Sequence, residues 1–77
     1  MSLPETLKLT RQKLLMSQEI FAKEINVSVA TINRWENGRS KPNLVAMKNI
    51  KEFCEKYNLP FETIQEEWLG HSEGGYK

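Results

Sequence analysis

Residues 25–38 read INVSVATINRWENG, and this stretch decides how the chain folds. Asn26 suits the left-handed backbone conformation that ends a helix. Ser28 can then cap the start of the next helix by accepting a backbone N–H. Only Asn26 and Val27 lie between Ile25 and this cap, and so short a turn makes two helices cross at a steep angle. The stretch therefore predicts two helices joined by a tight turn.

The helix after this turn should have two different faces. It is expected to run from Val29 to about Asn37, because Gly38 favours the conformation that stops a helix. Helical spacing puts three side chains on the inner face: Ile32, Trp35 and Glu36. The outer face should present Val29, Ala30, Asn33 and Arg34. An outer face that mixes small apolar side chains with polar ones needs an explanation.

Helix signals recur along the rest of the chain, and no stretch shows the alternation typical of a strand. Pro4 suits a first helical turn, and Ser17 and Asn43 can act as caps. Further helices are expected at about residues 5–15, 18–25, 44–57 and 62–69. Five short helices predict a compact all-α domain over residues 4–69, followed by a flexible tail at residues 70–77.

Apolar side chains at helical spacing indicate where the core lies. In the second helix, the expected anchors are Ile20, Phe21 and Ile25. The other large aromatic side chains are interpreted as core rather than as stacking surfaces: Trp35, Phe53 and Trp68. Cys54 lies in the apolar stripe of the fourth helix, where a small hydrophobic side chain fits.

The chain of 77 residues has a net charge of only +1, but the charge is unevenly spread. Residues 1–41 carry a net charge of +3 and residues 42–77 a net charge of −2. This asymmetry indicates either ordinary surface scatter or an electropositive face in the first half.

Composition argues against several classes of function. The single cysteine, Cys54, allows no disulfide within the chain and no cysteine-based metal site. His71 has no second ligand or catalytic partner nearby, so neither a metal nor an enzymatic dyad is predicted. No cofactor is expected, and no apolar run approaches the ~20 residues of a membrane span. We expect a cytoplasmic protein that is not an enzyme.

A dozen residues share the spacing of a known family. The pattern is similar to the lambda-repressor-like helix-turn-helix DNA-binding domain of phage repressors and Cro proteins: Arg11-x5-Ser17-Gln18-x3-Ala22-x4-Val27-Ser28-x3-Ile32-x2-Trp35-Glu36-Asn37-Gly38-x3-Pro42. The resemblance covers about residues 7–69. Leu15 and Asn26 depart from it, because the family often has Gly at both positions.

The resemblance implies that the helix beginning at Val29 enters the major groove of DNA. It places four residues at base-reading positions: Val29, Ala30, Asn33 and Arg34. Arg34 would donate two hydrogen bonds to a guanine edge, and Val29 and Ala30 would pack on thymine methyl groups. This role would explain the mixed outer face, because a bulky charged surface would obstruct the groove.

The resemblance also implies contacts to the DNA backbone. Gln18, at the start of the second helix, would bind a phosphate with help from the helix N-terminus. Polar and basic residues around the third helix would hold further phosphates: Lys23, Asn37, Arg39, Ser40 and Lys41.

Arg11 and Glu36 both face inward by helical spacing. A lone buried charge is very costly, so each is best explained by the other. The resemblance implies the same buried ion pair, which would join the first helix to the third in a structural role.

The predicted function is sequence-specific binding of double-stranded DNA, in a repressor-like transcriptional regulator. Two alternatives remain open: an antitoxin-type module that binds a toxin or another protein as well as DNA, and the DNA-targeting domain of a larger DNA-processing protein. A homodimer on adjacent half-sites is expected to form through the last helix. Its candidate contacts are Ile64, Trp68 and Leu69, which would otherwise close the core of the monomer.

Overall fold

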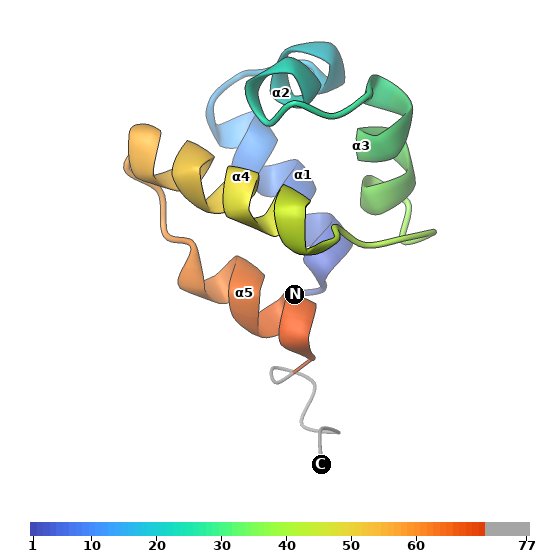
Figure 1. Cartoon of the computed structure of the whole chain (residues 1–77), viewed down its shortest axis with the longest axis vertical. Coiled ribbons are helices and arrows are strands. Elements are labelled where there is room, and N and C mark those ends of the chain that lie inside the picture. Colours follow the sequence, from blue (N-terminus) through green and yellow to red (C-terminus); the bar gives the residue numbers. More distant parts are fainter. Residues whose placement is uncertain (71–77) are drawn as a thin grey trace.

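Five α-helices with short connections make up the part of the chain that the computed structural model describes, residues 1–70 (Figure 1). The helices are α1 (Leu3–Lys13), α2 (Gln18–Glu24), α3 (Val29–Glu36), α4 (Leu44–Lys56) and α5 (Glu62–Leu69). The all-α prediction with five helices is confirmed. The predicted tail beyond Gly70, including His71, lies outside the described residues.

The first helix is shifted from its predicted position. It begins at Leu3 rather than Glu5, because the backbone N–H of Ser2 donates a hydrogen bond of 3.1 Å to the Glu5 carboxylate. It ends at Lys13 rather than near Leu15, which takes a φ of 58° and so cannot continue a right-handed helix.

The three predicted N-caps are present. The Ser17 hydroxyl accepts a hydrogen bond from the N–H of Ile20, and the Ser28 hydroxyl accepts one from Thr31. The Asn43 side chain likewise accepts the N–H of Ala46, at 2.8 Å. These local bonds explain why α2, α3 and α4 begin where the sequence predicts.

The tight turn between α2 and α3 is fixed by its own backbone conformation and by a hydrogen bond from α4. Asn26 adopts the predicted left-handed conformation, with a φ of 63°. From α4, the Asn49 side-chain amide donates a hydrogen bond of 3.1 Å to the carbonyl oxygen of Ile25. This bond satisfies a carbonyl at the end of α2 and fixes the turn against the rest of the domain.

One apolar core joins all five helices. Its fully buried side chains come from every helix: Leu7, Phe21, Ile25, Ile32, Ile50, Cys54 and Ile64. Trp35 is also buried, and the rings of Phe21 and Phe53 pack edge to face, with centroids 5.1 Å apart. The interpretation of Trp35, Phe53 and Cys54 as core residues is confirmed.

Ile20 is not the core anchor that the sequence predicted, because half of its side chain is exposed. The inward face of α2 is formed by Phe21, Ala22 and Ile25, and Ile20 lies on the opposite side of this helix.

The last helix packs against α1 and α4, and Figure 1 shows it beneath α4 and beside the N-terminus. Ile64 is buried, so it closes the core of the monomer and is not an exposed dimer contact. Trp68 is half-buried, whereas Leu69 is exposed. Within residues 1–70, no helix combines the length and apolar character needed to span a membrane.

Candidate nucleic-acid interface

The α3 helix has one buried face and one open face, and it lies at the edge of the molecule (Figure 1). Ile32 and Trp35 are buried and anchor the inner face in the core. The predicted base-reading side chains all lie on the exposed face: Val29, Ala30, Asn33 and Arg34. The inner face of α3 is therefore fixed in the core, and its outer face is open to a partner.

The Arg34 side chain is held along the helix surface. Its guanidinium donates a hydrogen bond of 3.2 Å to the hydroxyl of Thr31, which lies 2.9 Å from the Ser28 hydroxyl. A guanidinium has five N–H donors, so this contact leaves others free for a ligand. Thr31 was not predicted to take part, although its position three residues before Arg34 puts both on one face.

Asn33 and Asn37 form one polar unit at the end of α3. The Asn37 side-chain amide donates to the backbone oxygen of Asn33 at 3.0 Å and to its side-chain oxygen at 3.2 Å. A residue predicted to read bases is thus connected directly to one predicted to hold a phosphate.

Arg11 and Glu36 meet in a two-pronged ion pair that joins α1 to α3. Arg11 donates from Nε to one carboxylate oxygen of Glu36 at 2.8 Å and from Nη2 to the other at 2.9 Å. Its Nη1 donates to the backbone oxygen of Met16 at 2.9 Å. Only 11% of the Arg11 side chain and 5% of the Glu36 side chain are exposed. The hydrogen bonds to Glu36 raise the pKa of Arg11 above its ordinary value, so its charge is retained.

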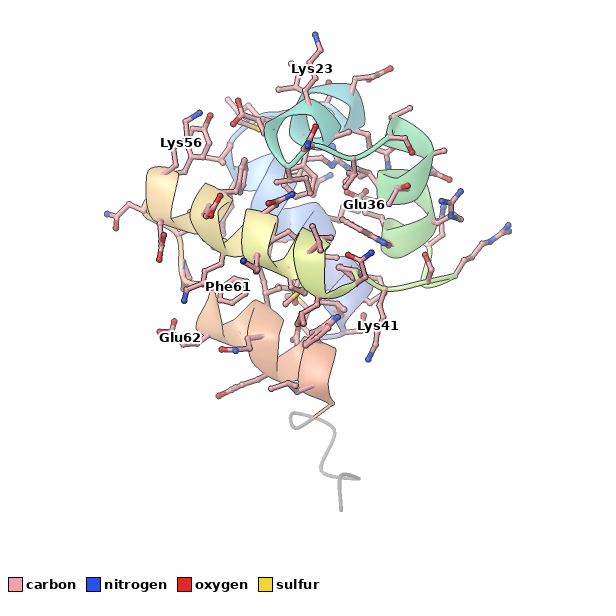
Figure 2. All side chains as sticks on the ribbon, viewed as in Figure 1. Lys23, Glu36, Lys41, Lys56, Phe61 and Glu62 are labelled. Atoms are coloured by element: carbon pink, nitrogen blue, oxygen red, sulfur yellow. The ribbon has the colours of Figure 1, made fainter. Side chains whose placement is uncertain are left out.

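The structure connects Gln18 to this ion pair. Its side-chain amide donates a hydrogen bond of 3.0 Å to Glu36, whose carboxylate points inward from α3 (Figure 2). The amide has a second N–H, which this hydrogen bond does not use. Sequence spacing gave no signal for this contact, because Gln18 and Glu36 belong to different helices.

The loop after α3 is fastened to α5. The Lys41 ammonium donates a hydrogen bond of 2.9 Å to the carbonyl oxygen of Trp68 and lies 5.5 Å from the centre of its ring. In return, the indole N–H of Trp68 donates to the carbonyl oxygen of Pro42 at 2.6 Å. Lys41, predicted as a phosphate ligand, therefore points toward α5 in this structure.

The other predicted phosphate ligands lie on the surface around α3. Arg39 and Ser40 are exposed in the loop directly after this helix. Lys23 is exposed on α2, and Figure 2 shows it above α2, whereas Lys41 lies below α3. Arg39 and Ser40 therefore lie beside α3, and Lys23 lies apart from the loop.

The described residues offer little for catalysis or metal binding. Within residues 1–70, no three His, Cys, Asp or Glu side chains come together in a group that could hold a metal ion. Cys54 is fully buried, and burial raises the pKa of its thiol to about 11. At neutral pH this thiol is protonated, so it is a weak nucleophile.

Comparison with known proteins agrees with this geometry. A family model described as helix-turn-helix matches residues 7–64, which is most of the chain and includes both helices of the tight turn. No curated protein and no solved structure gives a significant match. The chain therefore belongs to the Cro/C1-type helix-turn-helix family, whose members are DNA-binding domains rather than enzymes.

Proposed function

We propose that this domain is a sequence-specific, repressor-like transcriptional regulator that inserts α3 into the major groove of double-stranded DNA in the cytoplasm. The exposed outer face of α3 carries the proposal, because the opposite face is anchored by buried Ile32 and Trp35. Arg34 would read a guanine, while Val29 and Ala30 would contact thymine methyl groups. Asn33 would reach a neighbouring base edge.

Phosphate contacts would fix the orientation of α3 in the groove. The free N–H of Gln18 and the exposed side chains of Arg39 and Ser40 are suitable donors for phosphate oxygens, and Asn37 would join them by releasing a hydrogen bond to Asn33. Lys23 would add a contact at the α2 end.

One domain covers a single half-site, so two copies on adjacent half-sites would give useful affinity. Exposed Leu69 on α5 is a candidate contact between the copies.

Selection of bound duplexes from a random-sequence pool tests the proposal. The wild-type protein should enrich a defined motif, and an inverted repeat would indicate two bound copies. Arg34→Ala should lose preference at one base position, equivalent to roughly 1–3 kcal/mol of discrimination. Arg39→Ala serves as the matched control, because a lost phosphate contact should weaken all sequences alike and reduce the salt slope.

Two outcomes would contradict the proposal. Enrichment of no motif would exclude sequence-specific binding, and an unchanged motif for Arg34→Ala would exclude base reading by this side chain.

An antitoxin-type module that also binds a protein is the second candidate. Leu44 and Val45 favour it, because these neighbouring apolar side chains at the start of α4 are both about two-thirds exposed. Co-purification with the product of an adjacent gene, lost in Val45→Ser, would support this role. Absence of any stable complex would exclude it.

A further inference from the structure

We propose that Trp68 is a positioning residue for DNA binding. Together with Lys41 it forms a latch, defined as the Lys41–Trp68 and Trp68–Pro42 hydrogen bonds, that holds loop 38–42 in the shape that meets DNA. The inference rests on the proposed contact between this loop and DNA phosphates. Trp68 lies beyond the matched family region, residues 7–64, whereas Lys41 and Pro42 lie within it.

The latch connects the loop and the helix in both directions. Lys41 donates to the helix at 2.9 Å, and the Trp68 indole donates back to the loop at 2.6 Å. The carbonyl of Trp68 lies in the last turn of α5, where carbonyls lack partners within the helix. A cation is favourable there, because the C-terminal end of a helix carries partial negative charge.

The two halves of the loop are held differently. The N–H groups of Gly38 and Arg39 donate to carbonyl oxygens of α3, which fixes the first half. The second half depends on the latch and on buried Pro42.

Packing beneath the loop is incomplete. Loop residues 38–41 line one side of an open hollow, and Leu3 and Pro4 of α1 and Glu67 and Trp68 of α5 line the rest of it. Without the latch, Ser40 and Lys41 would lie over this hollow, held only through their neighbours Arg39 and Pro42. The free energy needed to order the loop would then weaken DNA binding. With the latch, the loop is already ordered when the protein folds.

Trp68→Phe tests the latch, because phenylalanine retains an aromatic ring but cannot donate to Pro42. We expect affinity for DNA to fall about three- to tenfold, by the same factor for preferred and unrelated duplexes. In the protein without DNA, NMR order parameters of the Ser40 and Lys41 amides should fall from about 0.85 toward 0.6. A loss of stability alone would not lower order in this loop selectively. Thr63→Ala, at an exposed position elsewhere on α5, is the matched control.

Lys41→Met supplies the second half of the test. It should reproduce the affinity loss of Trp68→Phe, and the double variant should lose no more than either single variant, as expected for one shared latch. The salt slope should stay unchanged. Additive losses with a slope shallower by about 0.9 would show that Lys41 binds a phosphate instead, and would overturn the latch.

Unchanged DNA affinity and unchanged loop order in Trp68→Phe would also overturn the proposed latch. Failure of the wild-type protein to bind any duplex would refute the proposed function, and the loop order parameters would still test the latch separately.

Discussion

Glu36 lies where three helices meet, and its carboxylate accepts hydrogen bonds from two of them. Arg11 on α1 and Gln18 on α2 both donate to it, while Glu36 itself belongs to α3. Because a buried charge without partners is costly, these contacts make the position of α3 dependent on α1 and α2. The residue that supports α3, the helix proposed to face DNA, is therefore on the buried side of that helix.

Removing this carboxylate should be strongly destabilising. Glu36→Ala leaves Arg11 in a poorly solvated position, so we expect the free energy of unfolding to fall by roughly 3–5 kcal/mol. Urea denaturation of the wild type and the variant measures this change. Glu36→Gln, which keeps the shape and one acceptor oxygen, should lose less. Equal stability of Glu36→Ala and the wild type would show that the ion pair has no structural role.

The connections between helices rely on residues in the left-handed conformation. Asn26 at the α2–α3 turn and Asn58 after α4 adopt it at modest cost, because asparagine tolerates these angles. Leu15, between α1 and α2, also adopts it, with a φ of 58° and 93% of its side chain exposed. A leucine in this conformation is strained, and its side chain contributes little packing in return.

Leu15→Gly should therefore stabilise the domain. Glycine adopts positive φ without strain, although it also gains freedom in the unfolded chain, so the net gain should be up to about 1 kcal/mol. Thermal denaturation measures it. Asn26→Gly is the matched control and should change stability less. A clear loss of stability in Leu15→Gly would mean that the leucine side chain makes a contact worth more than the strain.

The domain as a whole shows which features a sequence can predict. The starts of α2, α3 and α4 were predicted well, because the caps at Ser17, Ser28 and Asn43 are local hydrogen bonds. The exposed face of α3 followed from helical period alone. Ile20 was misplaced, because neighbouring apolar residues in a short helix leave the direction of the core ambiguous.

Contacts between distant side chains could not be predicted from spacing. Gln18 reaches Glu36, Lys41 reaches Trp68 and Asn49 reaches Ile25 only because the helices pack together. These contacts revise the environment of two predicted phosphate ligands, Gln18 and Lys41.

Cys54 allows a direct test of where DNA lies on the domain. Burial raises the pKa of its thiol to about 11, so near pH 8 it should remain protonated and out of reach of reagents. A cysteine introduced on the surface would then be the reactive thiol. Ala30→Cys places one on the outer face of α3, and Thr63→Cys places one on α5 as the control.

The most direct measurement is crosslinking of these variants to a duplex that carries a disulfide on a cytosine N4 in the major groove of the selected site. The account predicts that Ala30→Cys forms the mixed disulfide and that Thr63→Cys does not. Crosslinking of Thr63→Cys with none from Ala30→Cys would contradict the claim that α3 occupies the groove.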